Sequence, residues 1–344
     1  MARERPDLLI IHVSDFEVII PSLLAYDAGI MCAYLYDNFG RSEDSRVPPV
    51  RTAILPGNDW WASTKLRLAW KTLKIRRNLI GYFYGSLGLA HLPDLCRTSR
   101  QIAERCRYPW KFVESTDLLP LKARFPELVL WPRELEFPHD DRPGRYYLGC
   151  GIDLERQEVD FPWNSLDERR IIYCSLGTIP WASKSMYHRF FMAVLAAAEN
   201  KTEFQWVISL YDAADPEDFL NAPPNVHFLK RAPQLEILRR SAVAIVHGGG
   251  NTVKECAYFG VPMVVFPLGL DQPGNAARVV YHGLGVSGDF FTVTAGQLSA
   301  LLDRVERDSF IQMQARLMGG RLRAADLESP AVVFVEKLLG ATHA

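Results

Sequence analysis

An α/β fold with parallel sheets is the architecture that the sequence predicts, and three observations support it. Short apolar runs alternate with helical segments, which is the pattern of strands and helices in a doubly wound sheet. The length of 344 residues fits two domains. Residues 137–169 are rich in Pro, Asp and Glu, a composition that suits a connection between domains. We therefore predict one domain over residues 1–150, a linker over 151–169 and a second domain over 170–344.

Composition and charge exclude several classes of protein. Hydrophobic residues make up 48% of the chain, which excludes a largely disordered protein. Lys and Arg number 39 and Asp and Glu number 40, so the net charge of -1 gives no global basic field for nucleic acid. The six cysteines form no CxxC pair, which argues against zinc ribbons and redox dithiols. No apolar run is long enough to span a membrane and no signal peptide is apparent, so we expect a cytoplasmic protein.

The first half of the chain opens with a βαβ unit whose helix stops at Gly29. The elements predicted in this half are a strand, a helix and three further strands, over residues 8–13, 16–28, 30–36, 128–130 and 146–148. Residues 55–115 show no clear period and are rich in aromatic side chains, so we expect them to be irregular.

The second half is more regular. Its apolar runs predict five strands, over residues 171–175, 204–210, 226–229, 243–246 and 263–266. Helices are predicted between them over residues 186–199, 235–240 and 251–259. Cys174 and Cys256 lie in apolar surroundings and are expected in the core as reduced thiols. This alternation predicts a parallel sheet.

The segment from Val246 to Glu255 carries the most chemical information. A strand ends, a glycine turn follows and a helix opens at Asn251 or Thr252, both of which are good helix caps. Free backbone N–H groups and the positive helix end then meet at one point, which favours phosphate. His247 can donate a ring N–H to a phosphate oxygen, and Glu255 can accept from a ribose diol. The alternative is a glycine turn that only packs a helix against a strand.

Asp271 and Gln272 follow the strand predicted over residues 263–266. The carboxyl ends of parallel strands are where α/β sheets bind ligands. A carboxylate and an amide together suit a polyol such as a sugar, whereas by themselves they also make an ordinary loop.

These motifs occur in a fixed order that resembles the donor-binding signature of the UDP-glycosyltransferase family, whose GT-B fold has two Rossmann-like domains. The resemblance rests on Ala232 to Leu238, His247 to Thr252 with Glu255, Gly260-Val261-Pro262, and Asp271 to Ala276. The 14-residue step from Pro233 to His247 resembles the bacterial macrolide and antibiotic branch. The match is strongest over residues 171–290, where the segment from Tyr173 to Thr178 resembles the first strand and phosphate loop of the C-terminal domain.

The resemblance implies a role for each matching position in binding a UDP- or dTDP-sugar, with no further cofactor and no metal. Gln234 would hold the base, Glu255 the ribose, and Asp271 with Gln272 the sugar hydroxyls. The diphosphate would be held by Thr178, His247, Gly249, Asn251 and Thr252. Arg231 stands where many relatives place a Trp that stacks on the base, and a guanidinium can also stack. Gly250 replaces a larger residue, so that side of the pocket is expected to be roomier.

The start of the chain departs from the family pattern. In the family, a His after the first strand of the N-terminal domain activates the acceptor, and a later Asp orients it. Asp15 resembles that orienting carboxylate, although a simple helix N-cap explains it equally well. Roughly three βα units before it have no counterpart, so the His base is absent and the first strand should have an unpaired edge. A mis-called start codon, a degraded gene and a partner chain supplying the missing segment are the three explanations.

The implied reaction is a single inverting displacement that moves a hexose to a hydroxyl of a lipophilic small molecule, without a metal. The helix end and His247 would stabilise the leaving diphosphate. Asp140 and Asp141 lack the spacing of a metal site and are expected to be solvated, as are Lys254 and Arg278. A non-catalytic partner, or a truncated pseudoenzyme that only binds nucleotide-sugar, is the alternative from a different class. A sugar-nucleotide epimerase or a lipid-linked glycosyltransferase of the same fold is a further one.

Residues 62–81 carry six positive charges and no acid, interleaved with apolar side chains. This segment is either a surface helix that makes weak contact with anionic lipid or a solvated basic face beside an acceptor pocket.

Overall fold

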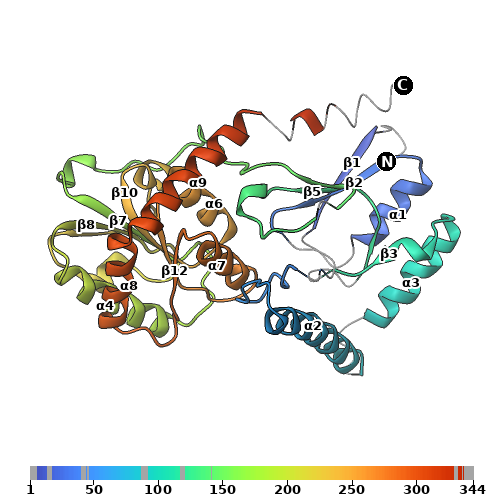
Figure 1. The fold of residues 1–344 in the computed structure, drawn as a ribbon, viewed down its shortest axis with the longest axis horizontal. Helices are drawn as coiled ribbons and strands as arrows, with labels where there is room; N and C mark the ends of the chain where they lie inside the picture. Colours follow the sequence, from blue (N-terminus) through green and yellow to red (C-terminus); the bar gives the residue numbers. More distant parts are fainter. Residues whose placement is uncertain are drawn as a thin grey trace. The chain divides into compact units, whose positions relative to one another are not determined.

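The computed structural model describes residues 6–13, 18–39, 44, 46–86, 92–116, 121–140, 142–328, 332–334 and 336. The chain divides into two compact units, residues 1–149 with 325–344 (unit 1) and residues 150–324 (unit 2). Each unit contains a sheet of parallel strands with helices around it (Figure 1). This confirms the predicted α/β class. Among the described residues, no helix is both long and apolar enough to cross a bilayer.

The unit boundaries differ from the predicted domain limits at two places. Residues 151–169, predicted as a linker, belong to unit 2, where Arg156 and Glu158 pair with side chains and backbone of that unit. Residues 325–344 group with unit 1, because Phe334 packs against the Tyr146 ring at 4.0 Å and joins a small core with Leu128. The division falls within the last long helix.

Unit 1 has a four-stranded sheet in the order β1-β2-β5-β6. Its strands are β1 (Leu8–His12), β2 (Met31–Tyr36), β5 (Glu127–Val129) and β6 (Arg145–Tyr147), with a separate antiparallel ribbon of β3 (Val113–Glu114) and β4 (Lys122–Ala123). Its helices are α1 (Ile19–Asp27), α2 (Trp60–Ser86) and α3 (Leu92–Arg105), with short 3-10 turns at Trp110–Phe112 and Arg133–Leu135. Gly29 ends the α1 turn at φ +69°, as predicted. Strand β1 lies at the sheet edge and, within the described residues, pairs with β2 alone.

The expectation of irregular structure over residues 55–115 is wrong, because most of this stretch is helical in α2 and α3. Helix α2 buries Leu66 and Trp70 on one side and exposes other apolar side chains on the opposite side. Apolar residues on two faces give no single helical period in the sequence, which hides the helix from a search for one stripe.

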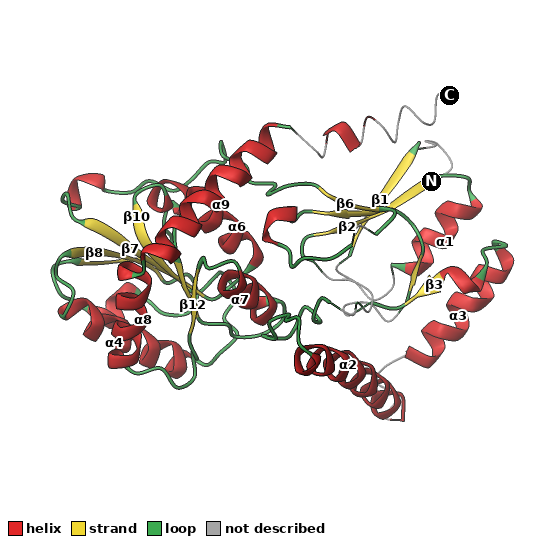
Figure 2. Ribbon diagram, in the orientation of Figure 1, coloured by secondary structure: helices red, strands yellow, loops and turns green. Residues whose placement is uncertain are grey.

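Unit 2 has six parallel strands in the order β12-β11-β10-β7-β8-β9. Figure 2 shows β7, β8, β10 and β12 of this sheet in yellow. The strands are β7 (Arg170–Ser175), β8 (Phe204–Ser209), β9 (Val226–Leu229), β10 (Ser241–Val246), β11 (Met263–Val265) and β12 (Gly285–Ser287). The helices are α4 (Lys184–Glu199), α5 (Gln234–Leu238), α6 (Gly250–Phe259), α7 (Gln272–Tyr281), α8 (Ala295–Arg307) and α9 (Ser309–Leu327), with 3-10 turns at Trp163–Ser165 and Pro216–Phe219. The chain order reverses between β7 and β10, the arrangement that places ligands at the carboxyl ends of these two strands.

The core of unit 2 lies between its sheet and helices α4 and α8. Alternate strand residues such as Ile172 and Cys174 point to this side and pack with Phe190, Trp206 and Phe266. Cys174 and Cys256 are both buried free thiols, as predicted. The opposite face of the sheet contacts α5 and α6, so both faces of the sheet are covered.

Candidate functional site

A cavity of about 430 Å³ opens at the carboxyl ends of β7 and β10, the two strands at the switch in chain order. These strands run in register, with Ser175 beside Val246. The loops that follow them therefore begin at the same level and face each other across the cavity. One loop carries Gly177 and Thr178, and the other carries His247 and the glycines. The topology alone thus brings together two loops that are about seventy residues apart in the chain.

Two glycines make room for the His247 imidazole. A Cβ atom at Gly177 would lie 2.6 Å from Nε2 of this ring, and one at Gly249 would lie 2.5 Å from the same atom. Gly177 also has a φ of +85°, which side-chain-bearing residues rarely adopt. Larger residues at either position would displace the ring, so the glycines fix where the imidazole lies.

Burial keeps the His247 side chain neutral. It is only 9% exposed, and burial lowers the pKa of the imidazole to about 4, against a smaller raising effect from a hydrogen bond with the Ser175 backbone. Its Nδ1 atom has no hydrogen-bond partner among the described residues. A neutral imidazole carries one N–H, which can serve either the Ser175 backbone or a bound anion but not both at once.

The N-terminus of α6 presents unpaired backbone donors to the cavity. Gly249 is the N-cap and has no side chain to accept a hydrogen bond, and the first helical bond runs from Val253 N to Gly249 O. Within residues 142–328, the N–H groups of Gly250, Asn251 and Thr252 have no partner. Asn251 and Thr252 therefore lie in the first helical turn and do not cap it, contrary to expectation. Three free donors at the positive end of a ten-residue helix favour a negatively charged ligand.

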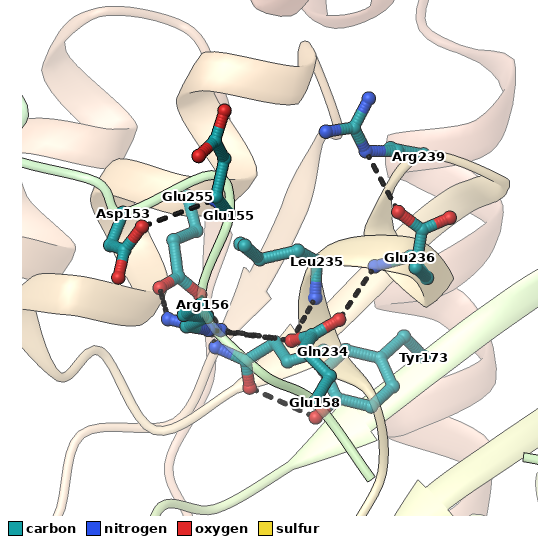
Figure 3. Close-up of polar contacts among 10 residues, drawn as sticks. All are labelled: Asp153, Glu155, Arg156, Glu158, Tyr173, Gln234, Leu235, Glu236, Arg239 and Glu255. Carbon is teal, nitrogen blue, oxygen red and sulfur yellow. Dashed lines mark hydrogen bonds and ion pairs between the residues drawn. The ribbon is translucent and has the colours of Figure 1, made fainter. Parts of the chain in front are cut away.

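A polar network forms a second wall of the cavity (Figure 3). Glu255 accepts from Arg156 Nη1 at 2.6 Å on one carboxylate oxygen and from the Gln234 amide on the other. The Gln234 carbonyl in turn accepts from the Tyr173 hydroxyl at 2.9 Å. Because every partner is itself held, the Glu255 carboxylate has a fixed orientation one turn into α6.

Glu158 connects this network to α5. Its carboxylate accepts from the Leu235 and Glu236 N–H groups at 2.9 and 3.2 Å, and also from Arg156 at 3.2 Å (Figure 3). Glu158 thus satisfies the first free donors of α5, the helix that begins with Gln234. The segment from Arg156 to Val159 thereby closes one side of the cavity.

Nine predicted site residues line this one cavity. They are Thr178, Arg231, Gln234, His247, Gly249, Gly250, Asn251, Thr252 and Glu255. Two others lie outside it: the Gln272 carbonyl accepts from the Leu268 and Gly269 N–H groups, and Asp271 accepts from Asn275 at 3.0 Å. Asp15 falls in residues 14–17, outside the described residues, and its role stays a prediction.

The expectation that Lys254 and Arg278 are solvated is wrong, since their exposures are 3% and 0%. Helix α6 is buried from Thr252 to Tyr258 and contacts α5, α7 and β10, so it has no solvent face for a lysine. Arg278 donates to the Gly274 carbonyl inside α7 at 3.1 Å. Asp140, by contrast, is exposed and pairs with Arg46, while Asp141 lies outside the described residues.

Sequence reasoning missed Arg156, Glu158 and Tyr211 as cavity residues. The first two lie in a charged stretch that was assigned to a linker, and Arg156 reaches Glu255 across 99 positions. No local spacing indicates such a pairing. Tyr211 follows β8 and has a φ of +47°. In the sequence, only its place directly after a predicted strand indicated that it could border a ligand site.

Comparison with known proteins finds a family model and several relatives that are similar to this chain. Residues 134–318 match the family model described as UDP-glucoronosyl and UDP-glucosyl transferase. The chain is 33% identical over 175 residues to the uncharacterized UDP-glucosyltransferase YdhE of Bacillus subtilis, covering 50% of this chain and 42% of the relative. It is 41% identical over 212 residues to the zeaxanthin glucosyltransferase of Pantoea ananas, covering 56% and 46%. The chain therefore spans less than half the length of these two relatives.

A solved structure, the glycotransferase of kitacinnamycin, shares the fold with a TM-score of 0.68. The two are 21% identical, and the match covers 98% of this chain and 77% of that one. At this identity the likeness concerns the fold alone.

Proposed function

This chain belongs to the UDP-glucoronosyl and UDP-glucosyl transferase family, and from that premise we propose that its cavity binds the nucleotide part of a UDP- or dTDP-sugar. The cavity, of about 430 Å³, has the size of a small-molecule site. The observation that carries the proposal is the uncapped N-terminus of α6 beside the buried His247. Three backbone N–H groups without partners converge there beside the neutral imidazole, and a diphosphate would accept from these N–H groups.

The remaining cavity residues suit the rest of a nucleotide. Glu255 has acceptor capacity left beyond its bonds to Arg156 and Gln234, so it can receive a ribose hydroxyl. Arg231 and Gln234 border the same cavity, and we assign them to the base. For the sugar we retain Asp271. Gln272 is buried with its carbonyl bound to loop N–H groups, so its proposed contribution is to hold that loop.

The proposed reaction transfers a hexose to an acceptor hydroxyl by an inverting displacement without a metal step. As the bond to the nucleotide breaks, negative charge grows on the leaving diphosphate, and the α6 N–H groups with His247 stabilise it. The acceptor oxygen must lose a proton, and Asp15 is the predicted orienting residue for the base that takes it.

We assign the lipophilic acceptor to a second cavity, of about 810 Å³, in unit 1. Trp60 and Trp70 line it together with polar and charged residues, which are Asp44, Arg46, Ser63, Thr64 and Arg67. The zeaxanthin glucosyltransferase among the relatives is in keeping with an apolar acceptor. The six cysteines are unpaired, which suits a reducing compartment such as the cytoplasm.

A binding-only protein, either a companion subunit or a truncated pseudoenzyme, is the second candidate. The observation that favours it is that the residues lining the proposed nucleotide cavity all belong to unit 2, so nucleotide binding does not by itself require acceptor activation. In that case the chain retains the nucleotide-sugar site of unit 2 and depends on another polypeptide segment for acceptor activation.

Isothermal titration of the full chain with UDP, dTDP and UDP-glucose tests the site. We expect His247→Ala to weaken UDP binding by about 1.5 to 3 kcal/mol, the scale of a hydrogen bond to a charged group. The control is His188→Ala, which removes an exposed imidazole from α4 of the same unit. No heat with any nucleotide would sink the proposal. Binding without sugar transfer to a panel of apolar alcohols would favour the binding-only protein.

A further inference from the structure

Among its described side chains, helix α2 has two apolar faces, one buried and the other exposed. On the packed face Leu66 and Trp70 are buried, and the Trp70 indole donates to the Val47 carbonyl at 2.9 Å. This contact attaches the helix to unit 1 along its first half. Figure 1 shows α2 as the long blue helix of that unit.

The opposite face carries an exposed apolar stripe that we define as Trp61, Leu68, Ile75 and Leu79. Their exposures range from 49% to 64%. Residues seven apart lie within about 20° of one another around a helix, so Trp61, Leu68 and Ile75 form one line. Leu79 continues it one turn after Ile75. Trp60 stacks on Trp61 with ring centroids 3.9 Å apart and extends the apolar surface at the start of the helix.

Positive charges border the stripe on both sides. By helical position Lys71 lies on one side, and Lys65 and Arg76 lie on the other, and all three are exposed. The sequence contains no Asp or Glu between Asp59 and Asp94. An apolar line between two basic borders, with aromatic rings at one end, matches a helix that lies in a membrane interface.

We propose that the α2 stripe docks on an anionic phospholipid surface, with its apolar side chains at the boundary between headgroups and acyl chains. Charge complementarity selects this occupant, because phosphate headgroups neutralise the basic borders. A second copy of the chain is disfavoured, since two α2 helices packed stripe to stripe would bring like charges together. The packed face remains on unit 1, so docking needs no unfolding of α2.

Co-sedimentation of the full chain with vesicles tests the proposal. We expect binding to phosphatidylcholine vesicles that contain phosphatidylglycerol, weak binding to phosphatidylcholine alone, and release by added salt. The double variant Leu68→Gln with Ile75→Gln should lose binding by about tenfold or more, because it removes the centre of the stripe. The matched control is Leu220→Gln, an exposed leucine of unit 2, which should bind as the wild type does.

A charge-reversal variant, Lys71→Glu with Arg76→Glu, provides a second test that leaves every apolar side chain in place. Both residues are exposed, so the variant should fold. It should lose binding to vesicles that contain phosphatidylglycerol, while its weak binding to phosphatidylcholine vesicles should not change. Equal binding of wild type and both variants would overturn the proposal. So would a dimer in analytical ultracentrifugation that the Leu68→Gln, Ile75→Gln variant abolishes, since the stripe would then belong to a second copy. Nucleotide binding by unit 2, measured on the same variants, should stay unchanged and keeps this test separate from that of the proposed function.

Discussion

Each unit buries a cluster of charged side chains, and the two clusters differ in what surrounds them. In unit 1, the side chains of Lys122, Glu127 and Arg145 are almost fully buried, and both cations bind Glu127, with Arg145 Nη1 at 2.7 Å from its carboxylate. Glu114 adds a second carboxylate at 3.0 Å from Lys122, and Arg142 closes the cluster at 2.7 Å from Glu114. Here cations and carboxylates face each other.

In unit 2, the corresponding cluster of Arg156, Glu158, Glu255 and Gln234 faces the cavity. Its arginine side chain remains 35% exposed, and beside it lie the buried His247 and the uncapped end of α6. Free backbone donors at the N-terminus of a helix favour a negatively charged ligand. The unit 1 cluster also borders a cavity, of about 270 Å³, but its charged groups are paired with one another, so we assign it to folding. The unit 2 cluster lies beside the free donors of α6, so we assign it to a ligand.

The sharpest way to break this comparison is Glu127→Gln in unit 1. Burial by itself would raise the pKa of Glu127, but Lys122 and Arg145 lower it below its ordinary value, so the carboxylate is charged at pH 7. Its neutral replacement leaves Arg145 buried without this counter-charge. We expect the opening free energy of β5 and β6 to fall by about 3 to 5 kcal/mol, measured by amide hydrogen exchange.

The control for this prediction is Glu104→Gln on α3, which removes an exposed ion pair with Arg100 from the same unit. Little change is expected there. Exchange in β7 and β10 of unit 2 should not respond to Glu127→Gln. Loss of protection in both units together would show that the cluster does not stabilise unit 1 alone, and this would contradict the comparison.

A second prediction concerns the pH dependence of unit 2 and comes from His247. The imidazole has a pKa of 6.5 when exposed and about 4 in the folded chain, because burial disfavours its charged form. Between these pH values the unfolded chain binds more protons, so stability rises with pH in this window. The stability of unit 2 is at its full value above pH 6.5 with respect to this group, and it falls by up to about 3 kcal/mol as the pH drops to 4.

Hydrogen exchange of β7 and β10, corrected for intrinsic rates at pH 7 and pH 5, measures this effect. The variant His247→Asn has no titrating ring and should show a flatter profile over the same range. If wild type and variant lost protection equally between pH 7 and pH 5, the buried imidazole would not be the source. The unit 1 cluster loses its stabilising contribution only at lower pH, where its carboxylates become protonated. The pH at which protection is lost therefore distinguishes the two units.

The sequence predicted unit 2 well from β7 to β11, whereas it led to no prediction for β12 or for helices α7, α8 and α9. The run from Val226 to Leu229 was predicted with its observed bounds, and the predictions for β7, β8, β10 and β11 differ from the structure by at most two residues at an end. Buried parallel strands are continuous apolar runs, so each is visible locally. Helix α2 was assigned to irregular structure, because Leu66 and Leu68 lie on different faces and blur the helical period.

The residues of the candidate site also fall into a group that local sequence predicts and a group that it does not. His247, Gly249 and Glu255 were predicted because the strand, turn and helix that hold them are adjacent in the chain. Arg156 was not, since only the folded backbone brings it to Glu255. Local sequence therefore indicated the face of the cavity formed by one loop, while the opposite face depends on tertiary contacts.

The smallest expected effect is that of substituting Arg156. Its contact with Glu255 tests whether the unit 2 cluster positions a ligand-binding group. The guanidinium holds one carboxylate oxygen at 2.6 Å while Gln234 holds the other, so Arg156 fixes the orientation of a group that we assign to the ribose. Because Arg156 is partly exposed, the contribution is modest. We expect Arg156→Lys, which keeps the charge but loses the planar fork, to weaken UDP binding about threefold, or about 0.6 kcal/mol.

Inorganic pyrophosphate separates this role from general electrostatics, since it has no ribose. Titration with pyrophosphate should give the same affinity for wild type and Arg156→Lys, whereas UDP should not. In a Glu255→Gln background the further change at Arg156 should have no effect on UDP binding, because the carboxylate it orients is gone. Arg239→Lys, which alters an exposed pair with Glu236 on α5, is the matched control and should leave both ligands unaffected. Equal weakening of UDP and pyrophosphate by Arg156→Lys would mean that the side chain acts on the diphosphate directly and does not position Glu255.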